Sequence, residues 1–418
     1  MKLKLPRGIR DIDPELYEKF LCIYDAFIET CRIFNFKVME PATIELFETL
    51  ALKSGPDIEK EIYAFKDKKG RLLGLRFDLT VGLTRYVVSN PHLPKPVKLA
   101  AFSVQWRYDE PQFGRYRSFY AWDIEIFGGE EEFSATEVLC FCEYLFRKLG
   151  LKNYIFKLSD RRLVEGLIQN LFEGINPIVI MRIIDKINRY PEDEIISMMV
   201  ESGMSKEESG ILLSYIKSKG NIGEVISIAK YDGPLLKVYD KLKDLNIPCE
   251  IDIGIVRGLD YYDGIVFEVY DKKALDVGAI CGGGSYTQLV KTFGGNVNAW
   301  GAAGGVERLI IALEKEGIKL RTNNNIRVYI ATAGVEYIDY AFKIAKSLRL
   351  AGLPTDINVT RRSLISQLEY ADKLSYDYTL IIGKKEVTTG TFLVRDMRRR
   401  EQHAFRSLNE VIDYIKGR

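Results

Sequence analysis

The chain has 418 residues, 47% of them hydrophobic and 28% charged, and a formal net charge of +2. One hydrophobic core does not grow to this size, so about two or three domains are expected. The composition excludes a disordered or collagen-like chain, and the small charge excludes a strongly basic, non-specific nucleic-acid binder.

The start of the chain and its cysteines bear on location and on metal binding. Met1–Ile12 is basic, is interrupted by Pro6 and Gly8, and contains no apolar signal segment. No apolar run reaches the roughly 18 to 20 residues that span a bilayer. We therefore expect a cytoplasmic protein with no membrane partner. The six cysteines form no CxxC pair and there are two histidines, so we expect reduced thiols and no metal site.

The first region, residues 1–158, mixes helical and strand patterns. Apolar residues recur at helical spacing over Glu15–Asn35. Three later segments are rich in aromatic and β-branched residues, as strands are: Arg71–Leu79, Val97–Tyr108 and Ser118–Gly128. Turns rather than regularly spaced helices join these segments. An antiparallel sheet is therefore predicted, and not a doubly wound parallel one.

Three further regions follow along the chain. Residues 159–247 show helical periodicity without a chemical motif, which predicts a helical insertion. Residues 248–320 return to strands and glycines and end in a helix that opens at Gly304–Gly305. The polar stretch Arg321–Asn325 predicts a linker, and residues 326–418 alternate strands with helices as a small α/β domain. The predicted fold class is α+β with an added α/β domain.

The segment Trp106–Gly128 carries the densest cluster of chemical side chains. Three arginines, at positions 107, 115 and 117, flank a turn signal at Pro111–Gly114. A guanidinium is a planar fork that matches phosphate oxygens, so the cluster suits a triphosphate or an RNA backbone. A solvated basic hairpin is the alternative interpretation. Asp123 and Glu125 then alternate with isoleucines, which places carboxylates on one strand face. Inward-facing acids need partners, as in a functional site.

This segment resembles motif 2 of class II aminoacyl-tRNA synthetases in its histidyl form. The stretch "VMEPATIELFE" is similar to motif 1, with Pro41 at a dimer interface, and "GAAGGVERLIIAL" is similar to motif 3, with Arg308 early in its helix. Arg257–Glu268 and Ile280–Val290 resemble the two peptides that distinguish histidyl-tRNA synthetases. The resemblance runs from Arg7 to beyond residue 383, apart from the helical insertion.

The resemblance implies an enzyme that activates histidine with ATP, releases pyrophosphate and transfers histidine to the 3′ end of its tRNA. It implies a class II antiparallel core interrupted by the insertion, an anticodon-binding C-terminal domain, and a homodimer. ATP with Mg²⁺ is the implied substrate complex, with no permanent cofactor. Gln112 at the tip of the motif 2 loop is implied to meet the tRNA acceptor end.

The resemblance also implies a role for each matching site residue. For ATP, Arg107 contacts the α-phosphate, Phe119 stacks on adenine and Arg308 contacts the γ-phosphate. Asp109 and Arg115 complete that set. Arg107 and Arg257 are the implied catalytic residues, Arg257 standing where other class II enzymes place a magnesium ion. The implied histidine-binding residues are Asp78 and Thr80 for the ammonium, Glu125 for the imidazole, and Arg257, Tyr261, Tyr262 and Tyr286 around them.

Other interpretations of single residues remain open at this point. Phe119 also fits core packing, the Tyr261–Tyr262 pair also fits an edge strand, and Gly282–Gly284 fits either a close backbone approach to a ligand or a tight turn. A surface position is the alternative for Arg257.

Several positions depart from the family pattern. Asp109 stands where glutamate is common, and Glu110 and Ser285 stand where arginine is common. Ala121 stands where the family usually carries a glutamine close to the amino-acid substrate, and Trp122 beside it is bulkier than expected. Either another side chain or water takes the place of that glutamine, or histidine binding is altered.

Two rival functions compete with this interpretation. One is a catalytically silent regulatory paralogue that serves a histidine-biosynthesis transferase; such proteins lack the C-terminal domain and lose motif arginines, both of which this chain keeps. The other is a sensor of uncharged tRNA fused to a kinase. The chain has no HRD motif followed by DFG, which argues against a kinase.

Overall fold

The computed structural model describes residues 3–52, 60–110, 114–187, 190–217, 222–256, 261–320 and 326–417. The chain forms two compact units, residues 1–320 and 321–418, which are treated separately below. Within the described residues, no helix is both long enough and apolar enough to cross a membrane.

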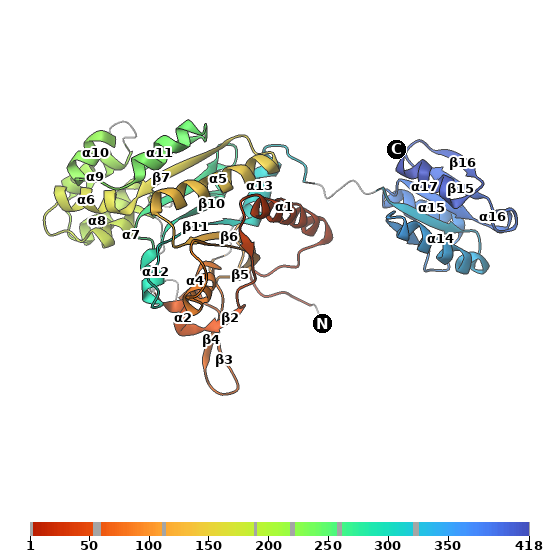
Figure 1. Cartoon of the computed structure of the whole chain (residues 1–418), viewed down its shortest axis with the longest axis horizontal. Helices are drawn as coiled ribbons and strands as arrows, with labels where there is room; N and C mark the ends of the chain where they lie inside the picture. The colour runs from red at the N-terminus through yellow and green to blue at the C-terminus, as the bar shows by residue number, and fades with distance from the viewer. Residues whose placement is uncertain are drawn as a thin grey trace. The chain divides into compact units, whose positions relative to one another are not determined.

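An eight-stranded sheet organises the first unit (Figure 1). The strand order is β1-β5-β6-β11-β10-β9-β7-β8. The six strands from β5 to β7 pair antiparallel, while the edge strands β1 and β8 pair parallel to their neighbours. The bounds are β1 (Lys37–Val38), β5 (Val97–Trp106), β6 (Ser118–Phe127), β7 (Tyr154–Asp160), β8 (Cys249–Ile251), β9 (Ile265–Asp271), β10 (Cys281–Ser285) and β11 (Ala299–Gly305). The predicted α+β class with an antiparallel core is confirmed.

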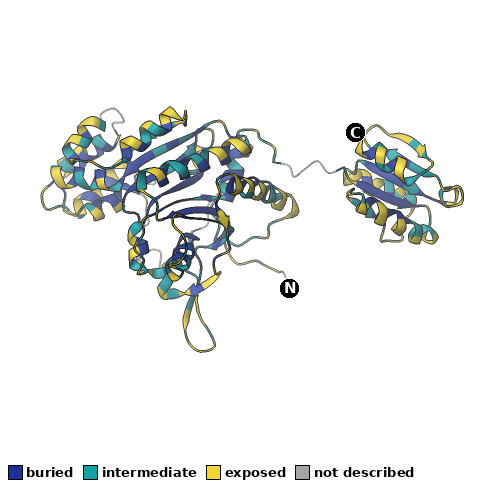
Figure 2. Cartoon of the chain, viewed as in Figure 1, coloured by how far each residue is buried: buried dark blue, intermediate teal, exposed yellow. Residues whose placement is uncertain are grey.

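Helices cover both faces of this sheet, and the hydrophobic core on one face is larger than the core on the other. The main hydrophobic core lies between one face and the long helices α1 (Pro14–Ile33) and α5 (Glu131–Leu149). A smaller core joins the opposite face to α4 (Thr80–Ser89) and α12 (Thr287–Thr292). The central strands are buried under both layers (Figure 2). Helix α13 (Val306–Lys315) follows β11 directly and packs beside β6.

Local sequence accounts for the long helix α1. Asp13 caps its N-terminus, where the side chain accepts a hydrogen bond from the Leu16 backbone N–H at 2.8 Å, and Pro14 occupies the first helical position. Phe20, Ile23 and Phe27 recur at helical spacing and are buried against the sheet. The apolar stripe and the cap together fix both the start of the helix and the face that it buries.

A three-stranded sheet extends from the first unit, with the order β2-β4-β3. Its members are β2 (Ile44–Leu46), β3 (Ala64–Lys66) and β4 (Leu72–Leu75), with α2 (Phe47–Ala51) beside them. The strand expected over Arg71–Leu79 is therefore shorter than the pattern suggested and lies outside the large sheet. Just after β4, the buried Arg76 side chain donates hydrogen bonds to Pro41 O at 2.6 Å and to Val104 O at 3.0 Å.

Between β7 and β8 the chain is helical. The bounds are α6 (Arg161–Leu171), α7 (Pro177–Ile184), α8 (Glu192–Glu201), α9 (Lys206–Lys217), α10 (Ile222–Ala229) and α11 (Leu235–Asp244), and the 3-10 turn η1 (Leu275–Val277) comes after β9. The buried Asp160 caps α6 through the Arg162 N–H and accepts a bond from the Tyr231 hydroxyl at 2.6 Å. These contacts connect the helical segment to the end of β7 in the large sheet.

The second unit is a five-stranded mixed sheet with the order β13-β12-β14-β15-β16. Its elements are β12 (Val328–Thr332), η2 (Val335–Tyr337), α14 (Ile338–Leu350), β13 (Thr355–Ile357), α15 (Leu364–Lys373), β14 (Tyr378–Ile382), α16 (Lys384–Thr389), β15 (Phe392–Asp396), β16 (Glu401–Phe405) and α17 (Leu408–Lys416). Strand and helix do not alternate throughout, because β15 and β16 form a hairpin. The polar sequence of β16 suits a sheet edge. Because that sequence lacks the apolar residues typical of strands, the sequence pattern did not predict β16.

Candidate active site

Strand β6 carries the carboxylates on which the site is built. Asp123 and Glu125 are 0% and 1% exposed, and they point away from Ile124 and Ile126, which belong to the main core. The alternation predicted for this strand is therefore observed, but both faces are covered. Burying two carboxylates close together on one strand face is unfavourable, so this arrangement is a cost that a bound ligand can offset.

Small residues surround these carboxylates on the neighbouring strand. Across β11, Glu125 lies opposite Gly301, Asp123 opposite Ala303, and Ala121 opposite Gly305. A Cβ atom added at Gly301 would lie 1.5 Å from Glu125 Oε2, whereas one added at Gly305 would meet nothing within 4 Å. The sheet therefore forms a floor of small residues beside open space at the Ala121 end.

A short hydrogen-bond network holds Glu125. The Thr80 hydroxyl donates to Glu125 Oε1 at 2.7 Å, and the Tyr286 hydroxyl donates to Oε2 at 2.5 Å. Thr80 is the first residue of α4, and Tyr286 follows β10, so three elements meet at one carboxylate. Burial, and then the charge of Asp123, raise the pKa of Glu125 well above its usual range.

Asp78 forms a second acidic position beside the first. Its Oδ1 accepts the Val81 backbone N–H at 3.0 Å, and its Oδ2 lies 3.4 Å from the Tyr261 hydroxyl. Burial raises the pKa of Asp78, and burial together with the Asp78 charge raises the pKa of Asp123 to about 8. The ring centroids of Tyr261 and Tyr262 lie 4.8 Å apart, and Tyr261 packs edge-on against Tyr286. These groups can recognise a small ligand with a cationic and an aromatic part.

Arginine side chains gather at the open end of the same sheet. Arg107 donates from Nε to Phe77 O at 2.9 Å, and its guanidinium lies 5.5 Å from the Phe119 ring centroid. Arg308, near the start of α13, donates to Ala279 O at 3.1 Å. Burial first, and then the charges of Arg115 and Arg107, lower the pKa of Arg308. Guanidiniums that lie close enough to repel one another suit a polyanionic ligand.

The remaining members of the arginine hairpin have different surroundings. Arg115 lies 3.4 Å from Asp109, whereas Arg117 donates to the Asp109 backbone carbonyl at 2.9 Å and stacks on Tyr108 at 3.8 Å. Arg117 therefore stabilises the backbone around Tyr108 and Asp109. Glu61 was not predicted from the sequence, yet burial and a hydrogen bond with Asp109 raise its pKa to about 7. No local motif surrounds Glu61, so only the fold reveals it.

A compact set of contacts anchors the segment that carries Tyr261 and Tyr262. Arg161, at the first position of α6, donates its N–H to Gly264 O at 3.0 Å and its Nη1 to Val256 O at 2.5 Å. The Glu131 carboxylate accepts the N–H of Ile265 at 3.0 Å. Asp263 also accepts bonds from the Ser285 hydroxyl and the Gln288 N–H. The two expected signature peptides are therefore hydrogen-bonded to each other and to the helical segment.

Two sequence expectations change on inspection of the sheet. Trp122 points to the opposite face, where its ring packs with Phe27 and Phe141, and a Cβ at Gly304 would lie 2.4 Å from it. Its bulk therefore does not enter the site. Gly282–Gly284 do not form a tight turn, because they lie within β10. A Cβ at Gly283 would lie 2.0 Å from Gly301 O, so close strand packing explains that glycine.

The predicted site residues are therefore placed as follows. Asp78, Thr80, Glu125, Tyr261 and Tyr286 meet directly in one buried network, with Tyr262 against Tyr261. The predicted ATP residues Arg107, Asp109, Arg115, Phe119 and Arg308 lie at its open end. Gln112 and Arg257 lie outside the described residues. Among the described residues, no group of three or more His, Cys, Asp or Glu is arranged to hold a metal ion.

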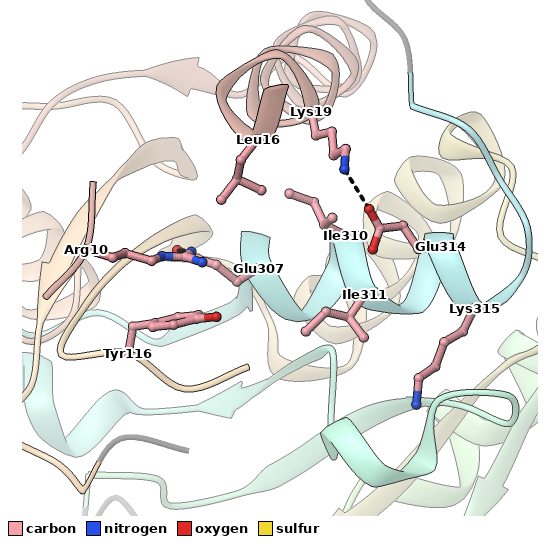
Figure 3. A pocket seen from close by; sticks show the side chains of 9 residues that line it. All are labelled: Arg10, Leu16, Lys19, Tyr116, Glu307, Ile310, Ile311, Glu314 and Lys315. Atoms are coloured by element: carbon pink, nitrogen blue, oxygen red, sulfur yellow. Dashed lines mark hydrogen bonds and ion pairs between the residues drawn. The ribbon is translucent and has the colours of Figure 1, made fainter. Parts of the chain in front are cut away.

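A separate cavity of about 430 Å³ lies between α1 and α13 and is lined by Tyr116 (Figure 3). Within it the Arg10 guanidinium stacks on Tyr116 at 3.6 Å and pairs with Glu307 at 3.1 Å. Its lining residues are Arg10, Leu16, Lys19, Tyr116, Glu307, Ile310, Ile311, Glu314 and Lys315. It contains none of the buried carboxylates of β6, so it is distinct from the site described above.

Comparison with known proteins identifies the relatives of this chain. The model of the histidyl-tRNA synthetase family matches residues 8–309, and that of an anticodon binding domain matches residues 327–418. The histidine–tRNA ligase of Pyrobaculum islandicum is 37% identical over 406 residues, covering 95% of this chain and 94% of that protein. The histidine–tRNA ligase of Pyrococcus furiosus is 33% identical over 426 residues, covering 98% of each.

A solved structure shares the whole architecture. The apo histidyl-tRNA synthetase of S. aureus is 25% identical, with a TM-score of 0.72 and coverage of 99% of this chain and 100% of that one.

Proposed function

The chain belongs to the histidyl-tRNA synthetase family, and we propose that the buried network around Glu125 is the histidine pocket of this enzyme. The chain is an ATP-dependent ligase that joins histidine to tRNA. The observation that supports the pocket most directly is the double hydrogen bond that Thr80 and Tyr286 donate to Glu125. With both donors engaged, the carboxylate is fixed in place and retains acceptor capacity for an imidazole N–H.

The same geometry supports a role for the other predicted residues of the pocket. Asp78 directly precedes Leu79, the N-cap residue of α4, and accepts only one backbone N–H at a short distance, from Val81. It therefore has capacity for the ammonium of histidine, with Tyr261 and Tyr262 closing the pocket as aromatic walls. A polar pocket of this kind rejects side chains that leave its groups unpaired.

The arginines at the open end are proposed to bind ATP, which enters as its magnesium complex. Arg107 would meet the α-phosphate and Arg308 the γ-phosphate, with Phe119 against adenine and Asp109 and Arg115 beside them. The histidine carboxylate attacks the α-phosphorus, the bond to the β-phosphate oxygen breaks, and pyrophosphate leaves. The arginines neutralise charge as it develops and hold the reactants in line. Arg257 is proposed as a further catalytic cation on the basis of its sequence match.

In the second step the terminal ribose hydroxyl of tRNA attacks the histidyl carbonyl and AMP leaves. Gln112 is proposed to meet the acceptor end, and the second unit to bind the anticodon. We further propose that the protein is cytoplasmic and forms a homodimer through the segment around Pro41. We also propose three parts: a catalytic core of residues 1–158 and 248–320, an insertion of residues 159–247 and an anticodon domain of residues 326–418.

Pyrophosphate exchange with ATP and each of the twenty amino acids tests the proposed site. We expect the wild type to catalyse exchange with histidine alone. Tyr286→Phe should reduce kcat/KM for histidine at least tenfold, because that change removes a hydrogen-bond donor to Glu125. Glu137→Gln on α5, which alters only a half-exposed pair with Lys98, is the matched control. Absence of exchange with every amino acid would instead favour the regulatory paralogue.

A further inference from the structure

Asp123 differs from the other carboxylates of the site because few hydrogen-bond donors stabilise its negative charge. The side chain is 0% exposed, and in the part of the chain that the structure describes Oδ1 has no hydrogen-bond partner. Oδ2 lies 3.3 Å from the Thr80 hydroxyl, but that hydroxyl has one proton and lies closer, at 2.7 Å, to Glu125. A buried carboxylate without a firm donor is costly, which indicates that something outside the chain completes it.

The residues next to Asp123 in the sheet are small and apolar. On its own strand face the preceding residue is Ala121, and its cross-strand neighbours are Ala101 on β5 and Ala303 on β11. None of these side chains has a polar atom. Alternate residues of a strand lie about 6.7 Å apart, so Asp123 sits between position 121 and Glu125 along the floor of the pocket.

The charged groups around Asp123 come from three directions. Asp78, from the segment before α4, and Glu125, from β6, are acidic, while the Arg107 and Arg76 guanidiniums exert a weaker favourable effect. Arg76 is already bonded to Pro41 O, Val104 O and Ser103. The local balance is therefore acidic, and an incoming cation would correct it.

Resting on the histidine pocket proposed above, we infer that Asp123 binds the α-ammonium of histidine together with Asp78, in place of the side chain that Ala121 is too short to supply. An ammonium has three donors and no acceptor. Oδ1 of Asp123 and Oδ2 of Asp78 are the two acceptors with capacity, and the Thr80 oxygen can take the third donor. The imidazole then extends toward Glu125 and Tyr286.

This arrangement couples binding to a proton. Because burial and the charge of Asp78 raise the pKa of Asp123 to about 8, the carboxyl is mostly protonated near neutral pH. When the ammonium arrives, the Asp123 proton passes to solvent and the carboxylate–ammonium pair replaces it. Histidine affinity should therefore rise as the pH is raised from about 6 toward 8.

The decisive experiment is calorimetry of the full-length wild type and Asp123→Asn with two ligands. The first ligand is histidine, and the second is 3-(imidazol-4-yl)propanoate, which lacks only the amino group. We expect Asp123→Asn to weaken histidine about tenfold or more, because a charged bond becomes a neutral one, and to leave the analogue within twofold. Adding Ala121→Gln to Asp123→Asn should recover part of the loss.

A matched control is available in the same sheet. Asp271 on β9 is also 0% exposed with one oxygen lacking a hydrogen-bond partner among the described residues, but it lies outside the site. Asp271→Asn should leave the affinity for both ligands unchanged. If Asp123→Asn does not fold, Asp123→Ala, which matches the small residues of the floor, replaces it with the same expectations.

The outcomes separate the inference from the function on which it rests. A wild type that binds neither ligand contradicts the proposed histidine pocket itself. A wild type that binds histidine while the Asp123 variant binds it equally well overturns the inference alone. Equal weakening of histidine and the analogue also overturns it, because that pattern reports a general structural role rather than a contact with the ammonium.

Discussion

Replacing Glu125 with glutamine tests the centre of the proposed histidine pocket while keeping its shape. In the wild type both carboxylate oxygens accept bonds, from Thr80 at 2.7 Å and from Tyr286 at 2.5 Å. The glutamine amide turns one oxygen into an NH₂ group, which then faces a hydroxyl that was donating to it. The bond to an imidazole N–H also loses its charge assistance.

The expected magnitude follows from these contacts. Converting one charged hydrogen bond into a neutral one costs about 1 to 2 kcal/mol, and disturbing a buried donor adds about 1 to 2 kcal/mol. The sum, about 2 to 4 kcal/mol, corresponds to a fall of roughly 30- to 1000-fold in kcat/KM for histidine. The KM for ATP should stay within about twofold, because the arginines at the open end are untouched.

Pyrophosphate exchange at varied histidine and varied ATP provides the measurement. Glu137→Gln again serves as the control, since that carboxylate is partly exposed and pairs with Lys98 outside the site. A kcat/KM for histidine within threefold of the wild type would refute the assignment, and so would an equal loss for both substrates.

Three further predictions concern the rest of the site. Arg308→Ala should raise the KM for ATP by about tenfold or more without lowering the unfolding temperature, because burial and neighbouring arginines disfavour the charge of Arg308. A lower unfolding temperature with an unchanged KM for ATP would contradict this. The unfolding temperature of the ligand-free protein should decrease as the pH is raised from about 4 to about 8, because the raised pKa of Asp123 makes the folded state hold a proton that the unfolded chain releases. In a pH series of thermal melts, Asp123→Asn should make this decrease smaller. Arg161→Ala, which removes the bond to Val256 O beside the Tyr261–Tyr262 segment, should raise the KM for histidine about tenfold but leave the KM for ATP unchanged. Arg161→Lys should restore most of the loss. An equal KM for histidine in the alanine and lysine variants would argue against a positioning role.

The sequence determined the local features of this protein and the family to which it belongs. The alternation of Asp123 and Glu125 with isoleucines predicted a strand with carboxylates on one face, and the structure has that strand as β6. The apolar spacing and the caps of α1 are equally local, because a helix needs only its own turn to define which residues share a face. The motifs around Arg107 and Arg308 gave the family, which the comparisons confirm.

Only the tertiary structure decided which side chains are partners. Register across the sheet places the small Gly301 against Glu125. Glu61 reaches Asp109 from a segment with no motif of its own. The missing hydrogen-bond partner of Asp123 is likewise invisible in the sequence, since it depends on three strands and a helix start that are far apart along the chain. Periodicity fixes the direction of a side chain, but burial and long-range pairing decide what it meets.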